Sequence, residues 1–182
     1  MRRSIRATLA VLAVTGGLVV TMTSPASADK PLVFEQGEFD DTFVIPGGVG
    51  FCDFDVQRRA TGTFKTTVFF DKDGETRLAK NHANGSTFWS LPGGDVVASE
   101  NWAVNNFFEL APGSGPETPP LSSTTVGNVW NVHGGAGGVL VNDSGRVVFD
   151  GDGNIVSVNG PHQALFGEVG ELCDALAASA GG

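Results

Sequence analysis

Residues 63–74 read Thr-Phe-Lys-Thr-Thr-Val-Phe-Phe-Asp-Lys-Asp-Gly and contain the two signals that decide the fold. Phe64, Thr66, Val68 and Phe70 alternate with Thr63, Lys65 and Thr67. Because side chains alternate across a strand, this segment has one mainly apolar face and one polar face. It ends in an Asp-Gly pair, which supplies the positive φ that a tight hairpin needs. A half-buried strand followed by a hairpin turn predicts antiparallel sheet.

The same alternation recurs along most of the chain. Three more apolar faces are Cys52, Phe54 and Val56; Trp102, Val104, Asn106, Phe108 and Leu110; and Val126, Asn128, Trp130 and Val132. The turn-rich residues 142–145 and 150–154 separate three short apolar segments, which predicts a meander near the C-terminus. In all we expect roughly eight to ten strands. The fold class is therefore predicted to be all-β: an antiparallel β-barrel, with a β-sandwich as the alternative.

Helical periodicity appears only near the C-terminus. Apolar residues at positions 169, 172, 173, 176 and 177 form one stripe, which predicts a short α-helix at about residues 168–178. Residues 111–120 contain four prolines and two glycines and are predicted to form a surface loop. We interpret this loop as lying within one domain at residues 29–182, with a domain boundary as the alternative.

Residues 1–28 are predicted to be a secretory signal peptide. Three arginines precede an apolar run at residues 7–20, and an Ala-Ser-Ala sequence predicts cleavage after Ala28. The apolar run is about 14 residues long, shorter than the ~20 residues of a membrane-spanning helix. We therefore expect a secreted, extracellular protein with no membrane span in its mature part.

Charge and composition exclude several classes of protein. Of the 182 residues, 41% are hydrophobic and 17% charged, which argues against intrinsic disorder. The formal charge is −9, with 20 acidic and 11 basic residues, and removing the three signal-peptide arginines makes it −12. Such an acidic protein repels phosphate backbones, so no nucleic-acid partner is expected.

Cys52 and Cys173 are the two cysteines of the chain. In an exported protein an even number of cysteines favours a disulfide. A bridge closing a loop of about 120 residues would stabilise the fold by roughly 4–5 kcal/mol. It would also attach the C-terminal helix to an early strand.

No motif for catalysis or metal binding stands out. His82, His133 and His162 are widely separated, and the acidic segments 71–75 and 150–154 lack the EF-hand glycine and glutamate, so hairpin turns explain them better. The glycine-rich residues 134–138 are not followed by a P-loop lysine. Catalytic residues remain unidentified, no metal or cofactor is expected, and a non-enzymatic function is favoured.

Polar residues on apolar faces suggest a binding site. Asn106 lies between Val104 and Phe108, and Asn128 between Val126 and Trp130. Buried amides need partners, which each could find in the other or in a ligand. We predict a pocket for a small apolar or amphipathic ligand. The candidate lining residues are Asn106, Asn128, Trp102, Trp130 and Phe108.

Short motifs resemble those of small secreted β-rich proteins of actinobacteria. They are a Cys-x-Phe-x-Val strand beginning at Cys52, the Asp73-Gly74 turn, the strand start at residues 152–156, and a Leu-Cys-x-Ala-Leu end at residues 172–176. The resemblance implies secretion and a β fold, and no particular reaction. The layout is also loosely similar to allene-oxide-cyclase and dirigent-type barrels.

The sequence leaves two alternative functions open. A dirigent-like or cyclase-like isomerase would need a titratable residue inside the barrel, whereas alternation places Asp53, Asp55 and Glu109 outside. An extracellular structural or protein-interaction module would instead present an exposed aromatic patch. Its candidates are Phe51, Phe69 and Phe107, which lie opposite the main apolar faces.

Overall fold

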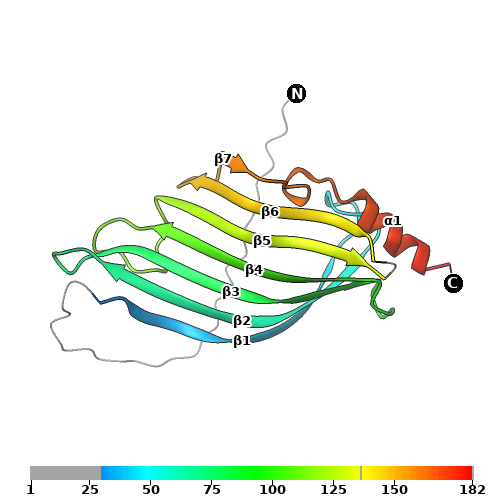
Figure 1. Cartoon of the computed structure of the whole chain (residues 1–182), viewed down its shortest axis with the longest axis horizontal. Helices are drawn as coiled ribbons and strands as arrows, with labels where there is room; N and C mark the ends of the chain where they lie inside the picture. Colours follow the sequence, from blue (N-terminus) through cyan, green and yellow to red (C-terminus); the bar gives the residue numbers. More distant parts are fainter. Residues whose placement is uncertain (1–29, 136, 182) are drawn as a thin grey trace.

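A computed structural model describes residues 30–135 and 137–181. Its described residues form one seven-stranded antiparallel sheet, in which each strand pairs with the next along the chain (Figure 1). The elements are β1 (Leu32–Ile45), β2 (Val56–Phe70), β3 (Thr76–Ser90), β4 (Ala98–Glu109), β5 (Ser122–Gly134), β6 (Val139–Asp150), β7 (Ile155–Asn159), the 3₁₀ helix η1 (Ala164–Phe166) and α1 (Gly170–Ser179).

The predicted antiparallel β-rich fold is confirmed, but the predicted closed barrel is wrong, as is the alternative sandwich. β1 and β7 are the two edges of a single open sheet. Alternation reports which face of a strand is buried, and it carries no information on whether the first and last strands pair. β1 has 14 residues and β7 only 5, so these two edges are poorly matched for closure. The sheet thus lacks the closure of allene-oxide-cyclase and dirigent-type barrels.

The predicted turns have mixed outcomes. The predicted turn at residues 71–74 lies in the connection 71–75 between β2 and β3, and residues 151–154 connect β6 to β7, as predicted. Residues 142–145 do not form a turn, because they lie inside the continuous strand β6. Gly145 has a φ of +128°, which side chains rarely allow, so a glycine is needed at this irregular position of the strand. The merging of two short segments into β6, and the length of the other strands, reduce the number of strands to seven. Residues 111–120 join β4 to β5 of the same sheet.

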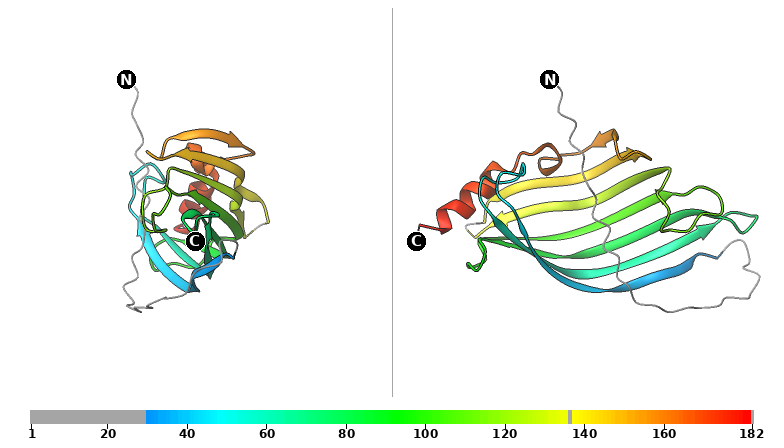
Figure 2. Two further views of the ribbon diagram at one scale, coloured as in Figure 1. Left: turned by 90° about the vertical axis from the view of Figure 1, so that its left-hand side faces the viewer. Right: turned by 180° about the vertical axis from the view of Figure 1, so that it is seen from behind.

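Glycines cross the middle of the sheet where it curves. Gly62 on β2 lies opposite Gly85 on β3, and a Cβ on Gly85 would overlap the carbonyl oxygen of Thr61. Gly127 and Gly145 form a similar pair on β5 and β6. Glycine in a strand marks a bend or a close approach of backbones. These glycines therefore permit the curvature that gives the sheet a concave and a convex face (Figure 2).

The hydrophobic core occupies one end of the concave face, where α1 packs inside the curve of the sheet (Figures 1 and 2). Leu172 and Leu176 of α1 are fully buried against this end of the sheet. The helix spans Gly170–Ser179, close to the predicted residues 168–178. The buried core residues are Cys52, Val56, Trp89, Ala98, Val132, Val141, Val169, Leu172 and Leu176.

The predicted disulfide between Cys52 and Cys173 is present, with Cα atoms 5.6 Å apart. It links α1 to the segment between β1 and β2, so Cys52 does not lie on a strand as predicted. The bond is consistent with an oxidising compartment. The predicted signal peptide at residues 1–28 lies outside the described residues. Among the described residues, neither helix has the length and apolar character of a membrane-spanning segment.

Candidate functional site

Beyond the core, the concave face begins with an aromatic pair. The rings of Phe39 on β1 and Trp102 on β4 stack with their centroids 6.0 Å apart. Gly62 and Gly85 lie between them in the strand register. Because these glycines have no side chains, two rings from strands that are not neighbours can meet above β2 and β3. The curved glycine region therefore has an aromatic layer over it.

A row of polar side chains crosses the same face farther from α1. Thr66, Asn81, Asn106 and Thr125 lie directly opposite one another on β2, β3, β4 and β5. Asn81 Nδ2 donates to Thr66 Oγ1 at 3.0 Å, and Thr125 Oγ1 donates to Asn106 Oδ1 at 2.8 Å. All four side chains are half-buried. We call these four residues the polar row.

Apolar side chains flank the polar row on both sides. One flanking row contains Phe64, Ala83 and Val104, and the other contains Val68, Ala79, Phe108 and Phe149. Val68 and Ala79 are buried, and the others are half-buried. With Phe39 and Trp102, these two rows form what we call the concave apolar face.

The structure brings three of the five predicted pocket residues together. Trp102, Asn106 and Phe108 share the concave side of β4. Trp130 lies instead in the core, with its ring 5.2 Å from that of Trp89. Asn128 lies on the other face, in register with Ala103.

A β-bulge explains why Asn128 and Trp130 do not share a face as predicted. The register of β5 against β6 shifts between these two residues, so the alternation reverses there. Asn128 Nδ2 donates to the backbone carbonyl of Asn101 at 3.1 Å. The two asparagines, Asn106 and Asn128, are therefore not partners in one pocket.

A buried polar cluster lies where the core meets the concave apolar face. It consists of Arg58, Thr87, Trp89 and Glu100, which occupy neighbouring register positions on β2, β3 and β4. Thr87 Oγ1 accepts from Trp102 Nε1 at 3.0 Å and from Arg58 Nη2 at 3.4 Å. A hydrogen-bonded path thus leads from the aromatic layer into the cluster.

Glu100 is the titratable group of this cluster with a strongly altered pKa. Its residue is only 3% exposed, and its Oε2 accepts a hydrogen bond from the Asn131 N–H at 3.1 Å. Burial raises the pKa of Glu100 to about 7, although the Arg58 charge and the nearby Thr87 hydroxyl oppose the shift. Burial also lowers the pKa of Arg58, although the Glu100 charge opposes it. Glu100 can therefore change its protonation near neutral pH.

Three polar atoms of the cluster lack hydrogen-bond partners within the described residues. They are Arg58 Nε, Trp89 Nε1 and Glu100 Oε1. The Trp89 indole lies close enough to affect the pKa of Glu100 but is not in hydrogen-bonding geometry. Arg58 and Glu100 form no ion pair in the described part of the chain. Buried polar groups are normally paired, so these three need an explanation.

The sequence prediction missed this cluster although the alternation contained its signal. The apolar face of β4 starts in that prediction at Trp102, and Glu100 lies two residues earlier on the same face. Arg58 likewise follows Val56 by two residues, and Thr87 precedes Trp89 by two. A period-two search restricted to apolar residues leaves out charged residues on the buried face.

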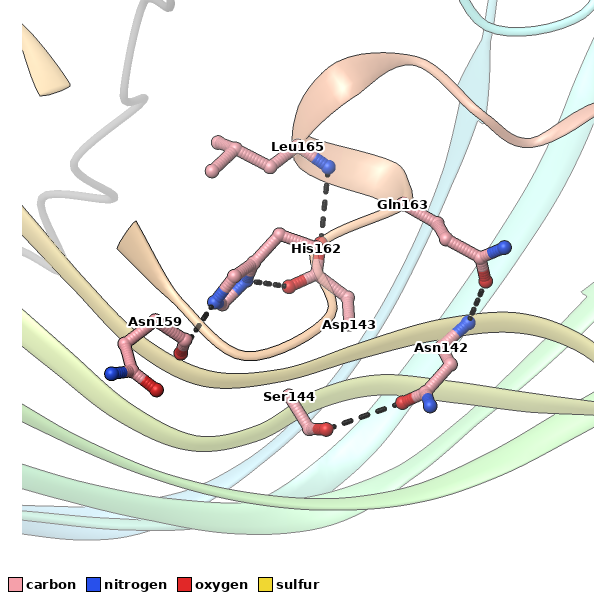
Figure 3. Close-up of polar contacts among 7 residues, drawn as sticks. All are labelled: Asn142, Asp143, Ser144, Asn159, His162, Gln163 and Leu165. Carbon is pink, nitrogen blue, oxygen red and sulfur yellow. Dashed lines mark hydrogen bonds and ion pairs between the residues drawn. The ribbon is translucent and has the colours of Figure 1, made fainter. Parts of the chain in front are cut away.

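A buried Asp143–His162 hydrogen bond lies near the β6–β7 edge of the sheet (Figure 3). His162 Nδ1 lies 2.6 Å from Asp143 Oδ1, and the Leu165 N–H donates to Asp143 Oδ2 at 3.0 Å. His162 Nε2 lies 3.2 Å from the backbone carbonyl of Asn159. Oxygen atoms thus lie next to both ring nitrogens, and these two contacts hold the imidazole ring in place.

An Asp–His pair is also part of a hydrolase triad, but here the geometry favours a structural role. A triad histidine presents its second nitrogen to a nucleophilic hydroxyl, whereas His162 presents it to a backbone carbonyl. The pair fixes the chain after β7 to β6. His162 is therefore a buried residue that is hydrogen-bonded to Asp143.

The acidic turns cap their own hairpins. Asp71 Oδ1 accepts from the N–H groups of residues 73 and 75, and Asp150 Oδ1 accepts from those of residues 152 and 154. This confirms the interpretation of both segments as hairpin turns. In residues 30–135 and 137–181, no three His, Cys, Asp or Glu side chains gather as a group that could hold a metal ion.

The convex face carries a shallow depression of about 420 Å³. Phe69, Leu78 and Phe107 contribute to its lining, with Arg77 and Glu109 beside them. Two of the predicted patch residues, Phe69 and Phe107, therefore lie close together. The third, Phe51, stacks on Trp89 in the core with ring centroids 5.6 Å apart.

Asp53, Asp55 and Glu109 are exposed, in agreement with the sequence prediction. No protein-family model, curated protein or solved structure matches the chain. The resemblance to small secreted actinobacterial proteins accordingly stays a prediction.

Proposed function

We propose that the concave apolar face binds a small apolar or amphipathic molecule. The observation that carries this proposal is the set of half-buried aromatic side chains, Phe39, Phe64, Trp102, Phe108 and Phe149, around the polar row. Binding sites for small molecules combine mostly apolar walls with a few fixed polar groups. The polar row supplies such groups in the middle of this apolar surface.

The lengths of the elements explain why this face is open to a ligand. α1 has 10 residues, which corresponds to a helix ~15 Å long. β2 and β3 each have 15 residues, which corresponds to strands ~50 Å long. One short helix therefore covers only a fraction of the strand length. Burying apolar surface there with a ligand would be favourable by ~25 cal/mol per Å².

Two alternative functions have weaker support. An isomerase needs a titratable group in contact with its substrate, and the candidates Asp53, Asp55 and Glu109 are exposed and do not belong to the concave apolar face. An interaction module would use a contiguous exposed aromatic patch. Phe51 belongs to the core, which leaves Phe69 and Phe107 as the aromatic residues of such a patch.

Adjacent phenylalanines on opposite faces provide a matched test. Phe108 belongs to the concave apolar face, and Phe107 lines the convex depression. The uncharged probe N-phenyl-1-naphthylamine fluoresces strongly in apolar sites, so its titration reports binding. We expect Phe108→Ala to weaken binding about ten-fold or more, equal to ~1.4 kcal/mol.

Phe107→Ala removes the same side chain from the other face and should leave the probe affinity unchanged. Equal weakening in both variants, or no binding to the unmodified protein, would contradict the proposed function. Weakening by Phe107→Ala alone would move the site to the convex depression.

We also propose that the protein is exported and belongs with the small secreted β-rich proteins of actinobacteria that it resembles. The Cys52–Cys173 disulfide supports export, because such bonds persist in oxidising compartments. Intact mass measurement of protein from the culture medium should give a chain beginning at Asp29 with its disulfide formed. A chain retaining residues 1–28, or one with free thiols, would contradict this proposal.

A further inference from the structure

We infer that Arg58, Trp89 and Glu100 form an anchoring site for a hydroxyl group at the end of an apolar ligand. This inference rests on the proposed function, because the rest of the ligand would occupy the concave apolar face. It deepens the proposal by naming the chemical class, an apolar alcohol or phenol.

The first argument is the hydrogen-bonding state of the cluster. Trp89 is fully buried and Glu100 is 3% exposed, yet each has a polar atom with no partner in the described residues. Arg58 Nε is also buried and without a partner there. A buried polar group without a partner is unfavourable, and such groups concentrate at functional sites. The cluster therefore offers two donors and one acceptor, at neighbouring register positions, to a partner from outside the chain.

The second argument is the match between these atoms and a hydroxyl. Arg58 Nε and Trp89 Nε1 are donors, and Glu100 Oε1 is an acceptor when the carboxyl is ionised. A hydroxyl accepts from the former two and donates to the third. A carboxylate would face the Glu100 carboxylate, an ammonium would face the Arg58 guanidinium, and a hydrocarbon would leave all three unpaired.

The third argument is the position of the cluster next to the concave apolar face. The Trp102 indole stacks on Phe39 and donates to Thr87 of the cluster. The Arg58 guanidinium lies 5.4 Å from the ring centroid of Phe43, a residue that is 44% exposed on the edge strand β1. The cluster therefore lies between an exposed edge residue and the aromatic layer of the proposed binding face.

The side chains between Glu100 and β1 are small. The register row from Glu100 leads through Thr87 and Ala60 to Asp41 on β1. Ala60 and Thr87 are buried, so a hydroxyl group that enters along this row would displace the groups that cover them. The exposed Asp41 carboxylate adds a further repulsion against anionic ligands.

Two probes with the same decyl chain test the inference. The compounds 1-decanol and decyl methyl ether share an alkyl chain, but the ether cannot donate a hydrogen bond. Their affinities are measured by displacement of N-phenyl-1-naphthylamine at pH 8. We expect the unmodified protein to bind the alcohol about ten-fold more tightly than the ether, and decanoate and decylammonium more weakly than the alcohol.

Two variants remove the anchoring groups in different ways. Glu100→Leu removes the acceptor, and Trp89→Phe retains an aromatic ring while removing the N–H. Both should bring the alcohol-to-ether affinity ratio close to one while the naphthylamine probe still binds. Glu109→Leu, an exposed carboxyl on the same strand, is the matched control and should keep the ratio of the unmodified protein.

The outcomes separate the inference from the proposed function. Absence of probe binding to the unmodified protein would overturn the proposed function, and the inference with it. Probe binding with equal affinities for alcohol and ether would overturn the inference alone. If Asn106→Leu abolishes the preference and Glu100→Leu does not, the hydroxyl binds to the polar row, and the inference is wrong.

Discussion

At neutral pH the buried carboxyl of Glu100 should lower the stability of the fold, and the Glu100→Gln variant should relieve this. Gln has almost the same shape, and its carbonyl oxygen can still accept from the Asn131 N–H. Arg58 on β2 is the charged group that acts on Glu100, and the Thr87 hydroxyl is an uncharged neighbour. Glu100→Gln thus removes the titration of the Glu100 carboxyl with little change in packing.

The pKa of Glu100 sets the size and sign of the effect. Burial raises this pKa to about 7 in the folded protein, whereas the ordinary glutamate value, which applies to the unfolded chain, is 4.5. Between these pH values the folded protein holds a proton that the unfolded chain has released. The stabilisation is therefore fully present below pH 4.5 and is lost as the pH rises through about 7. At ~1.4 kcal/mol per pH unit, the loss is on the order of 3 kcal/mol at pH 8.

Urea unfolding followed by tryptophan fluorescence, with the disulfide intact, measures this effect between pH 4.5 and pH 8. The free energy of unfolding of Glu100→Gln minus that of the unmodified protein should rise by on the order of 3 kcal/mol over this range. Taking the difference cancels the titration of every other group. Glu109→Gln changes an exposed carboxyl and should give a flat difference. A flat difference for Glu100→Gln, or a fall with pH, would refute the reasoning.

Three further predictions concern the fold. Gly85→Ala places a Cβ against the Thr61 carbonyl oxygen and should lower the free energy of unfolding by more than ~2 kcal/mol. The control Gly115→Ala, which has open space around it, should change the free energy of unfolding by less than ~0.5 kcal/mol. Equal urea midpoints for the two variants would contradict a close approach at Gly85. The disulfide joins cysteines that are 121 residues apart in the sequence, so reducing it should lower the free energy of unfolding by roughly 2–5 kcal/mol in the same assay. An unchanged urea midpoint would show that the disulfide does not stabilise the fold. Asp143→Leu leaves the buried His162 ring and the Leu165 N–H without their acceptor and should destabilise the fold by roughly 1–3 kcal/mol, with earlier proteolytic cleavage after β7. Cleavage at the rate of the unmodified protein would show that the pair does not fix this segment.

Sequence patterns predicted the local structure because local structure depends on neighbouring residues. The alternation around Phe64 and Val68 and the Asp-Gly turn at residues 73–74 correspond to β2 and its hairpin. The disulfide followed from there being two cysteines in a chain predicted to be exported. These features need no knowledge of the distant chain.

The errors occurred where one residue changes the relation between strands. The bulge between Asn128 and Trp130 reverses the alternation of β5. Two residues of the predicted pocket therefore lie elsewhere: Asn128 lies on the other face, and Trp130 lies in the core. The turn-like residues 142–145 form part of a strand, with Gly145 at a positive φ opposite Gly127. Closure of the sheet depends on both edges, which no single segment encodes. The polar composition of a segment therefore indicates a turn only where the partner strand also ends.

Stability and ligand selectivity should respond in opposite directions to the loss of the Glu100 carboxyl. Replacing a residue that serves only the fold lowers the stability of the protein. Replacing a buried charge by an uncharged side chain of similar size, in contrast, often costs little stability or even increases it. At pH 8 we expect Glu100→Gln to be more stable than the unmodified protein, and Glu100→Leu to lose the preference for the alcohol. A charge retained against the stability of the fold is typical of functional sites. If Glu100→Leu instead lost stability and kept the preference, the cluster would serve the fold alone, and the hydroxyl anchor would have to be abandoned.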